Sequence, residues 1–179
     1  AHGYHGDTLG AVAVGDRGNF LTGLFAPLLL ACDALEVGTD PRREIGGEVS
    51  ETGAALEAER GRIRRWFEAK GPGLAAFIAE PLLQGAGGMR MWPPELLQEI
   101  RLQCDRFGVY LILDEVMTGF GRTGTFLALE QAAVLPDLLC LSKGLSGGTL
   151  PLAMTWATDE IYGHFWGEYA EMRTFFHGH

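Results

Sequence analysis

The sequence predicts an α/β fold, a three-layer α/β/α arrangement in which helices cover a mostly parallel sheet. Helix-like and strand-like segments alternate along the chain, which is the pattern of βαβ units. The apolar runs are short and are closed by Pro, Gly or charged residues. A chain of 179 residues, 47% of them hydrophobic, is long enough for one domain with a buried core.

Two helices are predicted in the first part of the chain. Asp7 and Thr8 can cap a short helix that continues to Val14. Residues 15–50 are rich in Gly and Pro and show weak periodicity, so they are predicted to be mostly loop. Residues 51–71 have helical spacing and end at a glycine, which suits the C-terminus of a helix.

Strands and helices follow from residue 74 onward. The apolar run 74–82 predicts a buried strand that is stopped by Pro81. Residues 93–108 begin with proline, keep an apolar face and end at glycine, which predicts a helix. A strand is also predicted at 109–116, and two more at 137–143 and 151–158, with a helix candidate between these last two.

The charge balance and the cysteines narrow the class of protein. A net charge of −9 argues against a nucleic-acid partner, which would require a basic face. Cys32, Cys104 and Cys140 are far apart and fit neither a disulfide framework nor a zinc site, so a reducing compartment, the cytoplasm, is expected. The longest charge-free apolar stretch, 20–32, contains Gly and Pro and is too short to span a bilayer, so no membrane partner is expected.

Charged residues stand where three predicted strands end. Glu80 closes the first strand, Asp114 and Glu115 the second, and Lys143 the third. In a parallel α/β sheet the ligand lies beyond the carboxyl ends of the strands. We therefore expect these side chains to converge on one crevice.

Lys143 and Asp114 could support pyridoxal phosphate chemistry. A lysine at an apolar strand end can act as a nucleophilic amine, because partial desolvation lowers its pKa. An aspartate at the neighbouring strand end can bind a protonated ring nitrogen, and this lysine–aspartate pair is what pyridoxal phosphate requires. Spacing alone favours an ordinary structural interpretation of the same two residues. In that interpretation the lysine extends its charged end from a strand end into solvent, and the aspartate caps a turn.

Two further motifs suggest other chemistry. Residues 119–124, GFGRTG, match the G-x-G-x-x-G pattern of dinucleotide sites, but two carboxylates separate the strand from the first glycine, and no clean acid follows at the expected distance. His2, His5, His177 and His179 lie in HGYHGD and HGH, whose spacings fit no standard zinc pattern. Neither a nicotinamide cofactor nor a metal is therefore expected.

Five motifs occur in an order that resembles a known family. YHGDT, AEPLLQGAGGM, LDEVMTGFGRTG, LSKGLSGGTLPLA and FFHGH are similar to segments of the class III, fold-type I, pyridoxal phosphate aminotransferases, as is the spacing of 29 residues between Asp114 and Lys143. The resemblance covers essentially the whole chain. It implies the large cofactor-binding domain of that fold, with pyridoxal 5'-phosphate as cofactor.

Within the family, the resemblance is strongest to the branch that serves biotin biosynthesis. PLLQGAGGM and KGLSGGTLPLA carry it, and Met117 stands where the ornithine and 4-aminobutyrate branches usually have Gln. The implied reaction converts 8-amino-7-oxononanoate to 7,8-diaminononanoate, with S-adenosylmethionine as amino donor. Two alternatives stay open: another class III omega-aminotransferase (ornithine, 4-aminobutyrate or amine:pyruvate type), or a non-catalytic piece of the fold.

The resemblance also implies roles for particular residues. Lys143 would be the catalytic Schiff-base lysine, and Asp114 the partner of the pyridine nitrogen. Val116 would pack under the cofactor ring. Tyr4 would stack on its other face and border the substrate, with His5 shaping that turn.

Further residues are implied near the substrate and at a subunit interface. Asp7 and Arg122 would lie close to the substrate. Gly178 and His179 resemble a segment that reaches across a homodimer interface toward the partner's substrate and cofactor phosphate. Residues 1–179 are expected to form the central part of the large domain, without the N-terminal segment, its phosphate-binding loop, or the C-terminal small domain.

Overall fold

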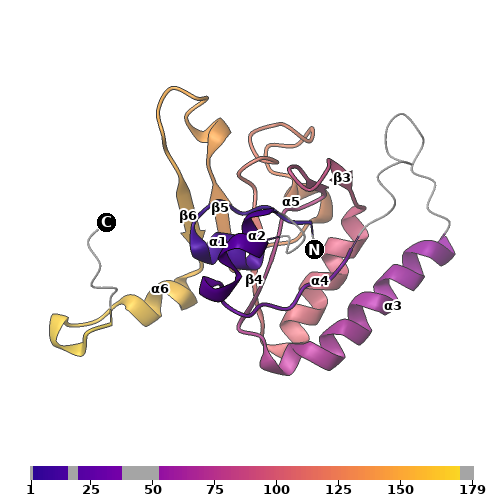
Figure 1. Cartoon of the computed structure of the whole chain (residues 1–179), viewed down its shortest axis with the longest axis horizontal. Helices are drawn as coiled ribbons and strands as arrows, with labels where there is room; N and C mark the ends of the chain where they lie inside the picture. The colour runs from indigo at the N-terminus through magenta and orange to yellow at the C-terminus, as the bar shows by residue number, and fades with distance from the viewer. Residues whose placement is uncertain (1, 16–19, 38–52, 174–179) are drawn as a thin grey trace.

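The computed structural model describes residues 2–15, 20–37 and 53–173, and its centre is a four-stranded sheet (Figure 1). The strands are β1 (Ala76–Ala79), β4 (Tyr110–Asp114), β5 (Leu138–Leu141) and β6 (Met154–Ala157), in the spatial order β1-β4-β5-β6. β1, β4 and β5 run parallel, whereas β6 is antiparallel to β5. The predicted, mostly parallel sheet is therefore confirmed.

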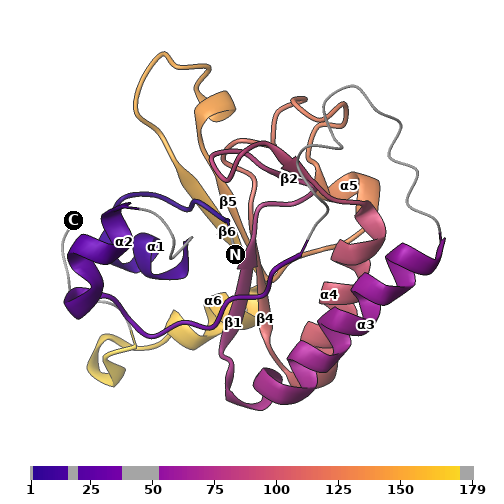
Figure 2. The same cartoon turned by 45° about the vertical axis from the view of Figure 1, so that its right-hand side comes forward.

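Helices lie on both sides of this sheet (Figure 2). The long helices α3 (Gly53–Lys70) and α4 (Pro94–Phe107) cover one side, and the short helices α1 (Leu9–Val14) and α2 (Phe20–Phe25) lie on the other. The chain leaves α4 through Gly108 at φ +66°, a left-handed conformation that glycine adopts without strain. The predicted layered α/β arrangement is confirmed.

The hydrophobic core lies between the two long helices and the sheet. Ile63 and Phe67 of α3 and Leu97 of α4 are fully buried, and they face the buried strand residues Leu111 and Leu113. Burying each such side chain contributes about 1.5–3 kcal/mol. This core fixes β4 in the middle of the sheet and so fixes the position of the residues that follow it.

Several short elements were not predicted. The segment expected to be mostly loop contains α2 and a 3₁₀ turn (Ala26–Leu28), and a small antiparallel hairpin of β2 (Leu83–Gln84) and β3 (Arg90–Met91) follows β1. The helix candidate between β5 and β6 is wrong, because that segment contains only a 3₁₀ turn. The single-turn helix α5 (Leu129–Ala132) lies between β4 and β5, and α6 (Asp159–Phe165) follows β6. Further 3₁₀ turns span Gly71–Gly73, Lys143–Leu145 and Tyr169–Glu171. Elements this short have too few residues to show a periodic pattern.

The predicted cap of α1 is wrong in its detail. Thr8 occupies the N-cap position, but its side chain makes no capping hydrogen bond. The Asp7 carboxylate instead accepts a hydrogen bond from the Tyr4 hydroxyl at 2.8 Å. The start of α1 is thus connected to the YHG motif.

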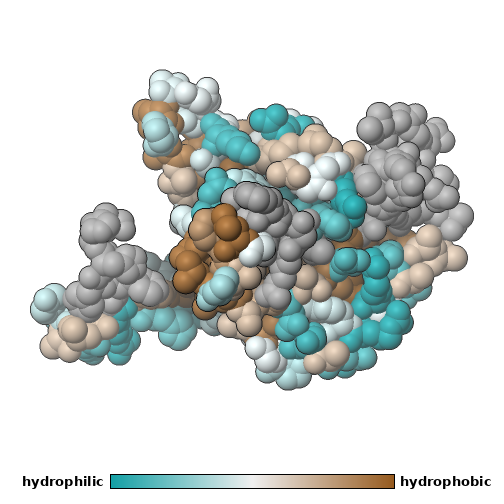
Figure 3. Space-filling model, in the orientation of Figure 1, coloured by the Kyte–Doolittle hydropathy of each residue, from teal (hydrophilic) through white to brown (hydrophobic). Residues whose placement is uncertain are grey.

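Apolar side chains also reach the surface. Figure 3 shows them gathered over α1 and α2, and Leu24, Leu28 and Leu30 are exposed there. On β6, Met154 and Trp156 are exposed as well. Within the three described segments, no helix combines the length and the apolar character that crossing a membrane requires.

Candidate active site

Asp114 is the last residue of β4, and it forms a buried pair with a residue from the N-terminal segment. The His5 Nδ1 atom lies 2.8 Å from Asp114 Oδ2, and the side chains of His5 and Asp114 are 5% and 8% exposed. The other carboxylate oxygen, Oδ1, accepts the backbone N–H of Val116 at 3.0 Å. The strand end therefore presents a carboxylate that is held at both oxygens.

Tyr4 and Glu80 flank this pair. The Tyr4 N–H donates to Glu80 Oε1 at 3.0 Å, and the Gly85 N–H donates to Glu80 Oε2 at 2.9 Å. Tyr4 is 41% exposed, and its hydroxyl bond to Asp7, followed by burial, raises the pKa of the phenol. The structure thus joins the YHG motif to the ends of both β1 and β4.

Glu115 does not join the crevice, contrary to our expectation. Its side chain is fully buried and accepts the backbone N–H groups of Ala128 and Leu129, each at 2.8 Å. It also accepts the Thr118 hydroxyl at 2.9 Å. Because successive side chains of an extended segment point to opposite sides, Glu115 faces α5 while Asp114 faces His5.

Lys143 follows β5, the parallel neighbour of β4. Asp114 is level with Cys140 in the register of the two strands, so Lys143 lies three residues beyond that level. Its backbone has φ +43°, a left-handed conformation that is uncommon for residues other than glycine. Such strained positions cluster at functional sites.

The environment of Lys143 differs from the expectation in one respect. Its side chain is exposed and forms no ion pair with the described residues, so the partial desolvation inferred from the apolar run is not present in this structure. The reason is local: the chain leaves the sheet at Ser142 and turns outward through a glycine-rich loop. The Ser142 hydroxyl fastens this loop by donating to the Leu152 carbonyl at 2.7 Å.

Two glycines bring the motifs into contact. A Cβ atom at Gly144 would lie 2.7 Å from Phe120, so the GFGRTG turn packs directly on the residue after Lys143. A Cβ atom at Gly85 would lie 1.9 Å from the Met117 sulfur, so the β2–β3 hairpin packs on the segment after Asp114. In the structure, Phe120 therefore occupies the room that the absence of a side chain at Gly144 leaves.

The GFGRTG segment does not have the geometry of a dinucleotide site. Residues 119–124 form turns, and the next helix is the single turn of α5. A pyrophosphate site requires the N-terminus of a longer helix at this point. Arg122 is exposed on this turn and donates from Nε to the Met117 carbonyl at 2.7 Å.

Other predicted site residues lie apart or outside the described residues. Asp7 is exposed and reaches the site only through Tyr4, and Val116 is half-buried beside Asp114. Gly178 and His179 lie outside the described residues, as does His177. Among the described residues, no group of three His, Cys, Asp or Glu side chains could hold a metal ion.

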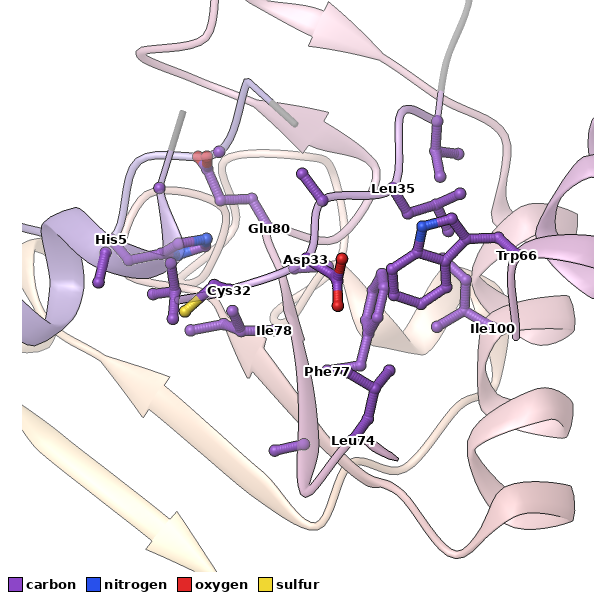
Figure 4. Close-up of a pocket in the computed structure, with 18 of the residues that line it drawn as sticks. His5, Cys32, Asp33, Leu35, Trp66, Leu74, Phe77, Ile78, Glu80 and Ile100 are labelled. Atoms are coloured by element: carbon purple, nitrogen blue, oxygen red, sulfur yellow. The ribbon is translucent and has the colours of Figure 1, made fainter. Parts of the chain in front are cut away.

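A cavity of about 360 Å³ lies beside β1, between residues 31–37 and helix α3. Figure 4 shows His5 and Glu80 at one end of this cavity and Trp66 with Leu35 at the other. Most of its lining residues are apolar, and Lys143 is not part of it. Of the described residues to which the resemblance gave a role, only His5 borders this cavity.

The sequence interpretation missed two features of the site. It placed Glu80 at the strand end but assigned it no role, and it did not predict that His5 would bind Asp114. Tyr4 and Glu80 are 76 positions apart in the chain, and His5 and Asp114 are 109 positions apart. The only sequence signal was an acid immediately before Pro81 at the end of an apolar run.

Comparison with known proteins identifies relatives over the whole chain. The family model described as aminotransferase class III matches residues 1–178. Two curated relatives are adenosylmethionine-8-amino-7-oxononanoate aminotransferases: that of Nitratidesulfovibrio vulgaris is 43% identical and that of Synechococcus elongatus 46% identical, over 100% and 98% of this chain. The chain spans 32% and 39% of the length of these two relatives.

Solved structures agree with this similarity. The crystal structure of adenosylmethionine-8-amino-7-oxononanoate aminotransferase from Methanocaldococcus jannaschii is 36% identical, with a TM-score of 0.79 over 99% of this chain and 38% of that one. An (S)-enantioselective omega-transaminase from Thermomicrobium roseum is 31% identical, with a TM-score of 0.74 over 99% of this chain and 38% of that one.

Proposed function

The chain belongs to the class III aminotransferases, and from this premise we propose that it forms part of the enzyme that aminates 8-amino-7-oxononanoate to 7,8-diaminononanoate in biotin biosynthesis. S-adenosylmethionine would be the amino donor. The family depends on pyridoxal 5'-phosphate. The observation that carries the proposal is the buried Asp114–His5 pair at the end of β4, next to the strand that leads to Lys143.

The acceptor positions of the Asp114 carboxylate fit the protonated pyridine nitrogen of that cofactor. A carboxylate offers about four lone-pair positions, and here one at each oxygen is used, by His5 and by the Val116 N–H. The remaining positions can accept a charged N–H, and the burial of the carboxylate strengthens that bond. The charge of Asp114 would keep the ring nitrogen protonated.

Lys143, Tyr4 and Val116 would each have a defined task. Lys143 Nζ would hold the cofactor covalently at rest and, once displaced by the amino donor, would carry the proton to and from the reacting carbon. Tyr4 and Val116 would pack on the two faces of the ring. Bound in this way, pyridoxal phosphate would supply an electron sink for the bond that breaks at the amine-bearing carbon.

Two considerations support the choice of substrate. The two curated relatives described above are named adenosylmethionine-8-amino-7-oxononanoate aminotransferases, and they are 43% and 46% identical to this chain. Met117 stands where other branches place a Gln, and a thioether cannot donate the hydrogen bond that Gln makes. An omega-transaminase is the alternative that the Thermomicrobium roseum structure supports, at 31% identity.

We also propose that the enzyme is a cytoplasmic homodimer with shared active sites. Exposed apolar side chains over α2 and on β6, Leu28 and Trp156 among them, support burial against a partner. Gly178 and His179 would then reach the partner's site, with His179 near the cofactor phosphate and Gly178 near the substrate. Three free cysteines are in keeping with a reducing compartment.

The test uses the full-length protein. Borohydride reduction followed by peptide mapping should find the cofactor on Lys143, and Lys143→Ala should abolish both the adduct and turnover. Lys70→Ala is the matched control, because Lys70 is another exposed lysine, paired with Asp33 at 2.9 Å. Absence of an adduct would favour the non-catalytic alternative.

An amino-donor panel then separates the two aminotransferase alternatives. S-adenosylmethionine should support formation of 7,8-diaminononanoate, whereas ornithine, 4-aminobutyrate and simple primary amines should not. Turnover with an amine and pyruvate, without turnover with S-adenosylmethionine, would assign the chain to the omega-transaminase branch.

A further inference from the structure

Glu80 is a buried carboxylate that the proposed chemistry does not use. It follows β1 at the same edge of the sheet as Asp114, and it is 4% exposed. Its two oxygens accept the backbone N–H groups of Tyr4 and Gly85. Within the described segments, no lysine or arginine forms an ion pair with it.

A carboxylate in this position is energetically costly. Burial raises the pKa of Glu80, and the N–H groups of Gly85 and Tyr4 and the nearby His5 oppose that rise, while the charge of Asp114 adds to it. Burying a charge without a cation is unfavourable unless its hydrogen bonds compensate. A side chain that only filled space would avoid this cost, so a positional role explains the residue better.

The two hydrogen bonds connect the segments that meet at Asp114. The Tyr4 N–H lies one residue before His5, so fixing it fixes the start of the peptide whose imidazole contacts Asp114. The Gly85 N–H belongs to the turn on which the sulfur of Met117 packs. Glu80 therefore holds both neighbours of the Asp114 strand end from one point.

We infer that Glu80 is a positioning residue, which clamps the Tyr4–His5 segment and the β2–β3 hairpin together and so keeps His5 on Asp114. This inference rests on the proposed function for its consequence, the binding of pyridoxal phosphate. The clamp itself is a property of the protein before any cofactor binds.

The first test needs no variant. In the cofactor-free, full-length protein the amides of Tyr4 and Gly85 should exchange with deuterium slowly, although neither lies in a helix or strand. Fast exchange at both amides would overturn the inference.

The second test uses Glu80→Gln and Glu80→Asp. The amide of Gln can accept from only one of the two N–H groups, and Asp keeps the charge but is too short to reach both. Both variants should exchange at Tyr4 and Gly85 at least about tenfold faster and should bind pyridoxal phosphate about tenfold more weakly. Wild-type affinity in Glu80→Asp would mean that charge alone matters, which overturns the positioning role.

Glu99→Gln is the matched control. Glu99 is another buried carboxylate, 5% exposed, which binds Arg64 and lies on α4. Its loss should lower stability without changing exchange at Tyr4 or cofactor affinity; a change as large as that in Glu80→Gln would show a general effect of unfolding and overturn the inference. If the amides are protected but no cofactor binds, the proposed function fails and the clamp stands.

Discussion

Replacing Glu115 with Gln tests how the loop after β4 is fixed. The Glu115 side chain is fully buried and its two oxygens accept three hydrogen bonds, from the N–H groups of Ala128 and Leu129 and from the Thr118 hydroxyl. In either orientation, the NH₂ group of Gln would face one of the two backbone donors. At least one buried N–H would therefore lose its acceptor.

The expected loss follows from these contacts. A hydrogen bond to a charged group contributes about 1.5–3 kcal/mol, and a buried donor left unsatisfied costs about 1–3 kcal/mol. Because these two figures describe partly the same loss, we expect Glu115→Gln to lower the free energy of unfolding by about 2–4 kcal/mol. That is a large part of the roughly 5–15 kcal/mol that typically stabilises a folded domain.

The assay is urea unfolding of the full-length, cofactor-free protein, followed by tryptophan fluorescence. Glu130→Gln is the control, since the exposed Glu130 carboxylate accepts the Leu127 N–H at 3.0 Å in the same segment. Water can replace that acceptor, so the control should lose less than about 1 kcal/mol. Equal losses in the two variants would refute the argument that burial makes the Glu115 bonds important.

Three other predictions concern buried groups and close packing. Burial raises the pKa of Glu80, so a proton binds this side chain more tightly in the folded than in the unfolded protein. The free energy of unfolding of the wild type relative to Glu80→Gln should therefore fall as the pH rises from about 4 through the folded pKa of Glu80. An increase in this relative stability, measured by parallel urea titrations, would contradict the prediction. Burial raises the pKa of the Cys104 thiol to about 12, so in the native protein the half-buried Cys32 should react with a disulfide reagent at least about a hundredfold faster than Cys104. Mass spectrometry can follow both reactions, and similar rates at the two cysteines would argue against a closed core. Gly85→Ala should lower the free energy of unfolding by about 1–3 kcal/mol, because its Cβ would meet the Met117 sulfur. In thermal melts, the double variant Gly85→Ala/Met117→Ala should recover most of that loss, whereas purely additive losses would exclude the contact.

Much of the fold was predictable from local patterns. Helices α3 and α4 and strands β1, β4, β5 and β6 were all predicted within a few residues of their observed bounds. Their apolar periodicity and their Pro and Gly boundaries are properties of neighbouring residues, so no knowledge of the tertiary structure is needed to see them. The antiparallel direction of β6 and the pairing of β2 with β3 could not be predicted in this way, because strand direction and pairing depend on partners elsewhere in the chain.

The candidate site was also predictable only in part from local patterns. The sequence made Asp114 and Lys143 candidates, because a charged residue that closes an apolar strand is visible locally and the rule for parallel sheets then places both at one edge. Spacing alone favoured an ordinary structural explanation for the pair, and only the family resemblance gave both residues a predicted role. The tertiary structure decided the rest: His5 binds Asp114, Glu80 holds Tyr4, and Glu115 turns away toward α5. Those assignments depend on contacts between residues far apart in the sequence and on which side of a strand a carboxylate faces, and both are settled only when the layers pack together.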